Sequence, residues 1–287
     1  MSLHAVKMLG ISVTTSPKKE ILEFIKKGLE PSALGLGKNN KTIQKPIIIV
    51  TPNPEQVMLA RNDTHVANIL NQADVALPDG VGLVWASRVL SSSRLAVSDL
   101  RVARAIPGVE FMEDLVELAA KQGYPVALIG GRRGLAVQTL ECLQRKHPKL
   151  VGWAEDGPEL SMQNAKCKMQ NGDEKAYYEA LTHRITESGA RIVFVGLGAP
   201  KQEFFIEQLK LETVKCKLEK PLVLMAVGGS FDIIAGRIPR APQVMRNLGL
   251  EWLWRLGAEP WRLKRQLALL RFIFFVLRKH TFKGSTL

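Results

Sequence analysis

A carboxylate stands at the end of a short apolar run, in the segment Ala73–Gly82. Asp79 occupies the middle of a Pro-Asp-Gly turn, and the glycines beside it let the backbone pass close to a ligand. In open α/β sheets the ligand crevice lies beyond the carboxyl ends of the strands, where a carboxylate can serve as a general base. Pro-Asp-Gly is also ordinary turn chemistry, and these three residues alone favour a plain turn. We predict Asp79 as the catalytic base because of the residues that accompany it elsewhere in the chain.

Two more polar side chains follow a second apolar run. Ile47–Val50 is short enough for a buried parallel strand, and Thr51 and Asn53 come directly after it. Asn53 can cap the next helix, with Pro54 at the first helical position and Gln56 reaching back. A helix N-terminus at a strand end is also an anion site. A capping role and a ligand-binding role for Asn53 are therefore compatible.

A third apolar run, Arg191–Gly198, leads to Gln202 at the start of the next helix. The carboxamide of Gln202 could bind a uracil edge or a sugar, or the residue could simply begin the helix. Gly130 and Gly131 end another strand-like run, but the chain has neither the dinucleotide-binding nor the P-loop fingerprint. These two glycines are as consistent with helix–strand packing as with a phosphate contact.

The chain is strongly basic, with a formal charge of +13 and a pI near 9.8. Such a charge predicts an anionic partner, which could be nucleic acid, a phosphorylated metabolite or an acidic lipid surface. Most of it lies in residues 237–287, where eleven Lys and Arg face only two Glu, a net +9. Sequence-specific DNA binding fits worse, because no helix-turn-helix or interleaved aromatic motif accompanies the charge.

The composition and the cysteine pattern favour a folded cytosolic protein. Hydrophobic residues make up 46% of the chain and charged residues 23%. Cys142, Cys167 and Cys216 are widely spaced, which predicts neither a zinc knuckle nor a disulfide framework. No metal-binding histidine spacing and no D-x-D pair occurs, so we expect no metal and no cofactor. We also expect neither a secretory signal nor a membrane span, because no apolar run is long enough.

Strand-like and helix-like segments alternate from Lys7 to about Gly236. This alternation predicts an α/β fold, a mostly parallel Rossmann-like sheet flanked by helices, in a catalytic domain of residues 1–236. The expected strands are Lys7–Val13, Ile47–Val50, the run before Asp79, Tyr124–Gly131, Leu150–Trp153, Arg191–Gly198 and Leu222–Val227. The expected helices are Pro17–Leu29 after a Ser16 cap, Thr64–Gln72, Leu83–Val89, Glu110–Gln122, Leu135–Arg145 and one from near Phe204. Gly35–Lys45 and Gly157–Lys175 are expected to be irregular surface segments.

Residues 237–287 are predicted to form an all-helical appendage. In its last helix, apolar residues recur every three or four positions beside a basic stripe. This helix could pack on the core with a solvated basic face, or it could lie in the headgroup region of a membrane, where tryptophans also gather. Both interpretations stay open. The apolar stripe is Leu263, Leu267, Leu270, Phe274 and Leu277, and the basic stripe is Lys264, Arg271 and Arg278.

Taken together, several segments resemble the WecG/TagA/CpsF glycosyltransferase family. They stand in the family's order and cover nearly the whole chain, and the set is specific although each segment alone is weak. The segments are Thr51-Pro52-Asn53, Leu77-Pro78-Asp79-Gly80-Val81-Gly82, Val195-Gly196-Leu197-Gly198-Ala199-Pro200-Lys201-Gln202-Glu203, Ala226-Val227-Gly228-Gly229-Ser230-Phe231-Asp232, Arg240-Ala241-Pro242, Leu250-Glu251-Trp252-Leu253-Trp254-Arg255-Leu256 and Glu259-Pro260-Trp261-Arg262-Leu263.

The resemblance implies a peripheral enzyme at the cytoplasmic face of the plasma membrane. It would move an N-acetylmannosamine-type sugar from a UDP donor to the 4-hydroxyl of polyprenyl-diphosphate-linked N-acetylglucosamine, with inversion. Asp79 would be the general base, and the C-terminal appendage would fold over the site and handle diphosphate groups. The implied substrate contacts are Thr51, Asn53, Arg104, Gln202, Arg255, Arg262 and Arg265, and the implied nucleotide loops contain Gly130, Gly131 and Gly198.

The chain departs from the family pattern near Arg104. Glu110 stands where the family commonly has Asp, and extra residues occur around Ser91–Asp99. UDP-N-acetylmannosaminuronate and UDP-glucose are therefore alternative donors, and a homo-oligomer is an open question. Two other classes of function are alternatives. A non-catalytic protein that binds anionic lipid or nucleic acid would need only the basic tail, whereas a dehydrogenase is disfavoured by the missing glycine fingerprint.

Overall fold

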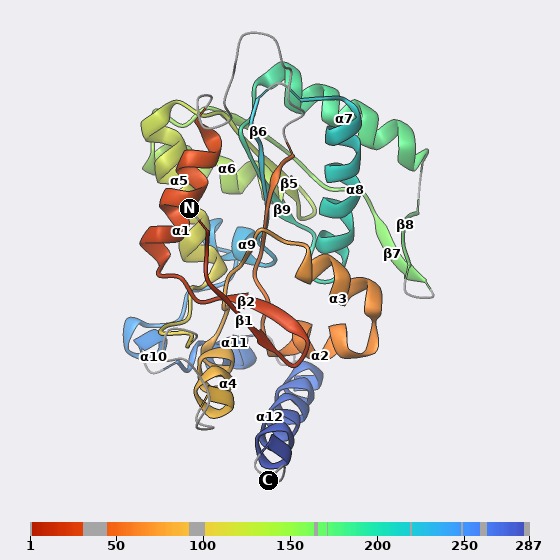
Figure 1. The fold of residues 1–287 in the computed structure, drawn as a ribbon. Helices are drawn as coiled ribbons and strands as arrows, with labels where there is room; N and C mark the ends of the chain where they lie inside the picture. Colours follow the sequence, from red (N-terminus) through yellow and green to blue (C-terminus); the bar gives the residue numbers. More distant parts are fainter. Residues whose placement is uncertain are drawn as a thin grey trace.

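A computed structural model describes residues 2–30, 45–91, 101–163, 166–170, 172–218, 220–247, 249–258 and 263–283 (Figure 1). The predicted polar loop at Gly35–Lys45 and the predicted break at Ser91–Ser93 lie almost wholly outside these residues. The described residues form a central sheet with helices on both faces, and further helices lie at one edge (Figure 1). The α/β prediction is therefore confirmed.

Among the described residues, six strands form the central sheet, and every neighbouring pair is parallel. Apolar, mostly β-branched runs build its centre, as expected for strands that are buried on both faces. In β9, Val193 and Val195 belong to the core on one face, and Ile192 and Phe194 to the core on the other. In spatial order the strands are β4 (Val75–Ala76), β3 (Ile47–Val50), β10 (Val223–Ala226), β9 (Ile192–Gly196), β5 (Val126–Gly130) and β6 (Gly152–Glu155).

Helices cover the two faces of this sheet and complete the two cores (Figure 1). On one face lie α3 (Thr64–Asn71), α7 (Glu174–Ser188) and α8 (Lys201–Lys215). On the other face lie α1 (Lys18–Leu29), α5 (Gly108–Gln122) and α6 (Leu135–Lys146). The helix predictions within these segments are confirmed to within a few residues, but α7 was not predicted. Two further helices, α2 (Pro54–Asn62) and α4 (Val81–Ser91), follow β3 and β4 at the carboxyl edge of the sheet.

The N-terminal prediction of one strand over Lys7–Val13 is wrong. The segment is an antiparallel hairpin of β1 (Ala5–Met8) and β2 (Ile11–Thr14), separate from the six-stranded sheet. Its two turn residues, Leu9 and Gly10, have φ values of 48° and 96°. Positive φ at both central positions matches the twist of a tight hairpin, and leucine gives no sequence signal for it. The predicted Ser16 cap is also wrong, because the Ser16 hydroxyl accepts a hydrogen bond from the backbone N–H of His4 instead.

The prediction of an irregular segment over Gly157–Lys175 is wrong as well. It contains a second antiparallel hairpin, β7 (Leu160–Gln163) and β8 (Lys166–Met169). Leu160 is buried, and alternate residues of both strands pack on the core beside α8. Asp173 then caps α7, accepting hydrogen bonds from the backbone N–H groups of Lys175 and Ala176. Alternation of apolar residues over only four positions is a weak sequence signal for a strand.

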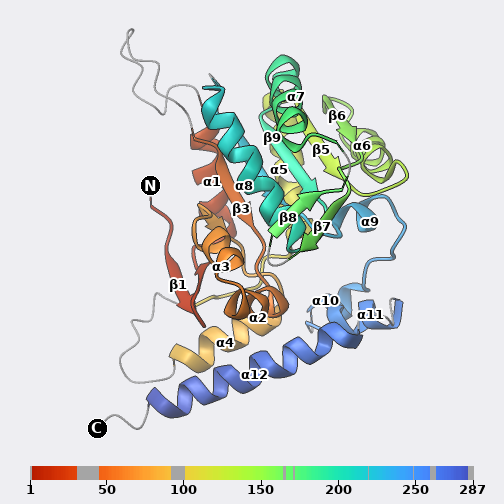
Figure 2. The ribbon, with the colours of Figure 1, turned by 90° about the vertical axis from the view of Figure 1, so that its right-hand side faces the viewer.

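The described part of the chain after the last strand contains α9 (Ser230–Ile234), α10 (Gln243–Asn247), α11 (Glu251–Ala258) and α12 (Leu263–Lys283). Figure 2 shows α12 running along the edge of the molecule beneath α2 and α4. Phe272 and Val276 are its fully buried side chains, and the Arg61 guanidinium of α2 lies 4.1 Å from the Phe275 ring. The predicted apolar stripe points elsewhere, because Leu270 and Phe274 are 63% and 59% exposed. None of the described helices has the length and apolar character needed to cross a bilayer.

Candidate functional site

Asp79 lies where the sequence placed it, at the carboxyl end of the edge strand β4. Its backbone N–H donates to the carbonyl of Pro52, with 3.0 Å between nitrogen and oxygen, so the segments after β4 and β3 lie side by side. Gly80 then adopts φ = 92°, and α4 begins at Val81. The Asp79 side chain is half-buried, at the boundary between core and solvent. A carboxylate in that position can be reached by a ligand at the sheet edge.

Thr51 and Asn53 follow β3 and lie next to the Asp79 segment. Thr51 is only 7% exposed, and a Cβ added to Gly108 would lie 3.1 Å from its methyl group, so the start of α5 packs closely against it. Asn53 caps α2, since its Oδ1 accepts from the backbone N–H of Gln56 at 2.9 Å, which confirms the predicted cap. The expectation that Gln56 reaches back to the cap is wrong: its side chain turns to α8 instead.

A chain of side-chain hydrogen bonds joins the loops after β3, β9 and β10. Gln56 Nε2 and Gln202 Nε2 both donate to Glu203 Oε1, each at 2.9 Å. Gln202 Oε1 accepts from the backbone N–H of Gly228 at 2.9 Å. Gln202 is 2% exposed and Glu203 1% exposed. The Gln202 carboxamide is thus fixed in one orientation, with both of its polar atoms bonded to neighbouring segments.

Burial raises the pKa of Glu203 to about 7, and this effect outweighs the hydrogen bonds from Gln202, the backbone and Gln56, which lower the pKa. The cause is the loss of hydration of the charged form. Glu203 was not predicted as a site residue. Its sequence signal is a carboxylate in the first turn of a helix that continues with the apolar residues Phe204–Ile206.

A cavity of about 360 Å³ lies beyond the carboxyl ends of β9, β5 and β6, whereas Asp79 lies beyond the carboxyl end of β4, at the opposite side of the sheet. Its charged lining residues are Arg132, Arg133, Lys201, Asp156 and Glu159. The Asp156 carboxylate accepts from the backbone N–H of Gly134, and Arg132 lies 3.8 Å from Glu159. Arg133 and Lys201 add positive charge that suits a diphosphate.

The predicted glycine loops border this cavity in different ways. Gly131 lines it directly, at φ = 75°. Gly130 has φ = 128°, and a Cβ there would lie 2.6 Å from the carbonyl of Gly196, so Gly130 allows β5 and β9 to approach closely. At Gly198, with φ = 76°, a Cβ would meet open space. The packing interpretation therefore describes Gly130, whereas Gly131 and Gly198 lie on loops that a ligand could approach.

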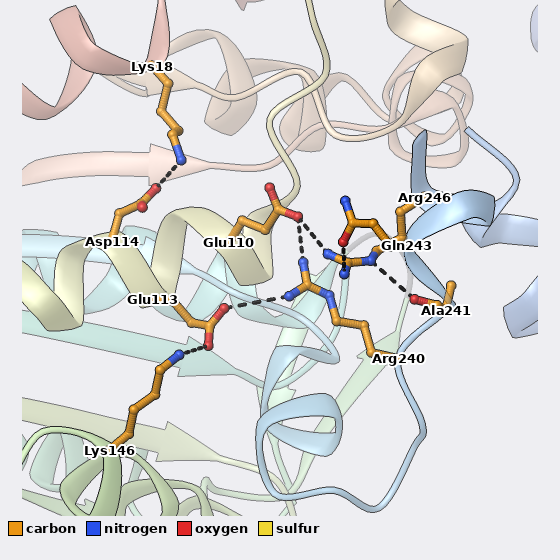
Figure 3. A network of polar contacts seen from close by, with 9 residues as sticks. All are labelled: Lys18, Glu110, Glu113, Asp114, Lys146, Arg240, Ala241, Gln243 and Arg246. Carbon is orange, nitrogen blue, oxygen red and sulfur yellow. Dashed lines mark hydrogen bonds and ion pairs between the residues drawn. The ribbon is translucent and has the colours of Figure 1, made fainter. Parts of the chain in front are cut away.

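Arg104 lies close to the Asp79 segment and is exposed. Two residues later, the backbone N–H of Ile106 donates to the carbonyl of Pro78 at 2.9 Å. Glu110, where the chain departs from the family pattern, forms ion pairs with two arginines. Figure 3 shows the Glu110 carboxylate between Arg240 and Arg246, at 2.6 and 3.3 Å. This contact ties the first turn of α5 to the C-terminal segment.

The C-terminal segment also lies against the Asp79 loop. A Cβ on Gly249, which joins α10 to α11, would lie 2.4 Å from a methyl carbon of Val81, and one on Gly82 would lie 2.7 Å from Pro54 and 3.6 Å from Leu269 of α12. The turn between α10 and α11 and the helix α12 therefore cover the residues that flank Asp79.

Three predicted arginines fall at the edge of what the structure describes. Arg255 lies in α11 and Arg265 in α12, but their side chains, and the whole of Arg262, lie outside the described residues. Their role in binding diphosphate stays a prediction. The sites that sequence reasoning missed, Glu203 with Gln56 and Glu110 with its arginines, all depend on contacts between distant segments.

One comparison with known proteins bears on this arrangement. The family model described as "Glycosyl transferase WecG/TagA/CpsF family" matches residues 6–286, nearly the whole chain. The match includes the loops of Asp79, Thr51 and Gln202, the cavity beyond β5 and β9, and the C-terminal helices. The chain therefore belongs to the WecG/TagA/CpsF family, and it is a glycosyltransferase.

Proposed function

We propose that this enzyme moves N-acetylmannosamine, or a related hexosamine or hexose, from a UDP donor to the 4-hydroxyl of polyprenyl-diphosphate-linked N-acetylglucosamine, with inversion and without a metal. The observation that carries the proposal is the single row of strand ends at one sheet edge. Asp79 stands at β4, Gln202 follows β9, and the basic cavity begins beyond β9. Three strand spacings separate β4 from β9, about 14 Å, so the row suits an extended nucleotide-sugar.

In this arrangement the nucleotide occupies the cavity and the sugar points along the edge toward Asp79. Arg133 and Lys201 would neutralise charge on the diphosphate, and the N-terminus of α8, where Lys201 stands, adds backbone N–H groups that attract an anion. Thr51, Asn53 and the loops around Gln202 would border the sugar. Guanidinium groups and helix N-termini can stabilise the departing UDP, so the mechanism requires no cation.

Asp79 would act on the acceptor. Its carboxylate takes the proton from the acceptor hydroxyl while that oxygen forms the new bond to the anomeric carbon, and the bond from that carbon to UDP breaks on the opposite face. Inversion needs no covalent bond between sugar and enzyme. The elements that cover Asp79, the turn at Gly249 and α12, would hold the lipid diphosphate of the acceptor above the base, with Arg255, Arg262 and Arg265 as its partners.

The acceptor is a membrane lipid, and the molecule presents a surface that suits one. Leu267, Leu270, Phe274 and Leu277 of the stripe on α12 are exposed, Trp252 is 40% exposed on α11, and residues 237–287 carry a net +9. An apolar stripe flanked by arginines is typical of helices that lie in the headgroup region. We therefore propose peripheral attachment at the cytoplasmic face of the membrane, where nucleotide-sugars are made.

The test is incubation of the full chain with a panel of UDP-sugars and a short-chain polyprenyl-diphosphate N-acetylglucosamine acceptor, with product mass as the readout. UDP-N-acetylmannosamine is expected to give a disaccharide-lipid, in the presence of EDTA as in its absence, and UDP-glucose and UDP-N-acetylmannosaminuronate serve as alternative donors. Asp79→Asn is the matched control for background transfer. No product with any donor would contradict the proposed reaction, and product that requires added Mg²⁺ would contradict the metal-free mechanism.

A further inference from the structure

Glu203 is a buried acid whose surroundings contain two amide side chains. It is 1% exposed, and its Oε1 accepts from both Gln56 and Gln202. Within the described part of the chain, no ion pair involves Glu203. A carboxylate buried without a cation is costly, because the charge loses its hydration and gains no compensating charge.

Two oxygen atoms beside these hydrogen bonds have no partner among the described residues: Glu203 Oε2 and Gln56 Oε1. Glu203 Oε2 belongs to the carboxyl group whose Oε1 accepts from Gln56, and Gln56 Oε1 belongs to the carboxamide whose Nε2 donates in that same hydrogen bond. Ionised, Glu203 would leave two buried acceptors with nothing to accept from. Protonated on Oε2, it becomes a donor, and the free acceptor on Gln56 is its complement. One proton shared between these two atoms would satisfy both and would close a cyclic acid–amide pair.

The position of this pair connects it to the site. Gln56 lies in the first turn of α2, beside the Asn53 cap and the segment that holds the Asp79 backbone. Gln202 links the pair to Gly228 after β10. The Glu203 carboxyl therefore lies at the centre of the polar contacts that join the loops after β3, β9 and β10.

We propose that Glu203 is a positioning residue that works in its protonated form, holding Gln202 and the first turn of α2 in place for sugar transfer. Loss of the proton would set two acceptors against each other and push the loops after β3 and β9 apart. The inference rests on the proposed function for its effect on activity, but not for the protonation itself. The burial-driven pKa near 7 places the loss of the proton in an accessible pH range.

Charged groups nearby do not account for the raised pKa of Glu203. The charged and titratable groups on the elements packed around Glu203 include Lys201 and Glu207 on α8, Glu55 and Arg61 on α2, His65 on α3, Tyr178 on α7 and Cys167 on β8. None of them is among the causes that shift the pKa of Glu203. His65 Nε2 and Glu207 Oε2 form a contact at 2.8 Å one turn further along α8. That pair must therefore be controlled for.

The test compares Glu203→Gln, Glu203→Ala and Glu203→Asp with the unchanged chain. Glutamine reproduces the neutral acid, because its Nε2 can donate where the protonated Oε2 does. We expect Glu203→Gln to keep most of the wild-type kcat at pH 6.5, whereas the other two variants lose about a hundredfold in kcat, with a smaller change in KM, as misplaced reacting groups do. Wild-type kcat should fall as the pH rises above about 7, and the fall should be absent in Glu203→Gln.

The matched control is Glu207→Gln, which removes a carboxylate and the His65 pair from the same helix and should keep both the activity and the alkaline fall. pH-difference infrared spectroscopy gives a readout without substrate: a protonated-carboxyl carbonyl band that is lost above about pH 7 in the wild type and is missing in Glu203→Gln. An inactive Glu203→Gln at pH 6.5, or an alkaline fall that persists in it, would overturn the proposal. If no donor gives product with the wild-type chain, the proposed reaction fails while the infrared result still decides the protonation.

Discussion

Asp79 lies beyond the carboxyl end of β4, and the segments of Thr51 and of the C-terminal helices lie beside it. A base in that position contributes only when the acceptor hydroxyl is present, so its removal should leave donor binding unchanged. In the proposed arrangement, by contrast, the loops around it hold the donor. Chemistry and binding can therefore be separated by single substitutions.

For Asp79→Asn we expect kcat to fall by about two to four orders of magnitude, the usual contribution of a general base. The dissociation constant for the UDP-sugar should change little, because the amide has the shape of the carboxylate. Product mass gives the rate and titration calorimetry gives the binding. Glu117→Gln, an exposed carboxylate on α5, is the control. Near-normal turnover in Asp79→Asn would remove Asp79 from the mechanism.

Glu203→Gln should also change how stability depends on pH. The pKa of Glu203 is about 7 in the folded chain against 4.5 for an unperturbed carboxyl, so between these values the folded state binds the extra proton. The wild-type free energy of unfolding therefore falls as the pH rises from 4.5 to 7 and stays low above that range. Glutamine carries no such penalty. Relative to the wild type, the variant should gain about 3 kcal/mol between pH 4.5 and pH 8, from 1.36 kcal/mol per pKa unit.

Urea unfolding at pH 5 and pH 8 measures this difference. The same comparison on Glu207→Gln shows how much of it belongs to any carboxylate of α8. If the two free energies of unfolding differed by an equal amount at both pH values, Glu203 would be ionised in the folded chain at pH 5 already, and the acid–amide pair would not exist.

At the scale of elements, the C-terminal segment is held to α5 by a small ion-pair network. Glu110 accepts from Arg240 and Arg246, while Glu113 lies between Arg240 and Lys146 (Figure 3). The side chains of both arginines are only about a quarter exposed, 26% and 23%. Removing the shared carboxylate would take one charged acceptor from each of two partly buried guanidinium groups, which costs about 1–3 kcal/mol.

We therefore expect Glu110→Gln to loosen α10 and α11 from α5. Hydrogen exchange followed by mass spectrometry should show faster exchange in residues 240–258, by up to about a hundredfold for a local loss of 1–3 kcal/mol. Asp114→Asn is the matched control, because Asp114 lies on α5 as Glu110 does, but its ion pair is with Lys18 of α1. Equal protection of residues 240–258 in the two variants would show that the network does not hold the segment.

Elements that form because of a local sequence pattern could be predicted, whereas elements that depend on pairing or on an unusual backbone conformation could not. β3, β9 and β10 are continuous apolar runs, and burial on both faces alone explains them. The hairpin of β1 and β2 depends on a positive φ at Leu9, and that of β7 and β8 on pairing between two four-residue strands, neither of which a local pattern reveals. These elements are stabilised by contacts that form only in the folded chain.

The candidate site divides in the same way. Asp79, Thr51 and Asn53 could be predicted because each follows a recognisable strand, and strand ends gather at one edge. The bonds from Gln56 to Glu203 and from Glu110 to Arg240 join residues 147 and 130 positions apart. Separations of that size carry no periodicity, so only the folded arrangement shows them.

For the whole molecule, α12 presents two different faces. Phe272 and Val276 are fully buried against α2 and α4, the elements that flank Asp79. The stripe that includes Leu270 and Phe274 faces outward, beside Arg271 and Arg278, in a segment with net charge +9. One helix thus connects the site to a surface suited to anionic lipid. Attachment to the membrane and coverage of Asp79 would then depend on opposite sides of the same element.

The double substitution Leu270→Ser and Phe274→Ser should separate these two roles. Each apolar side chain kept in water instead of lipid costs on the order of 1.5 kcal/mol, so partition onto vesicles should weaken by about a hundredfold. Pelleting with vesicles that contain anionic phospholipid measures it, and added salt should weaken binding of the wild type further, because each Lys or Arg near the surface contributes about 1 kcal/mol. UDP-sugar binding should be unchanged, since the buried face is intact.

Phe272→Ala is the opposite control: it opens a cavity costing about 3–5 kcal/mol of packing and should loosen α12 from α2 while the outward stripe keeps its residues. Undiminished vesicle binding by the double variant would mean that the outward stripe does not contact lipid, and α12 would then serve only to cover the site.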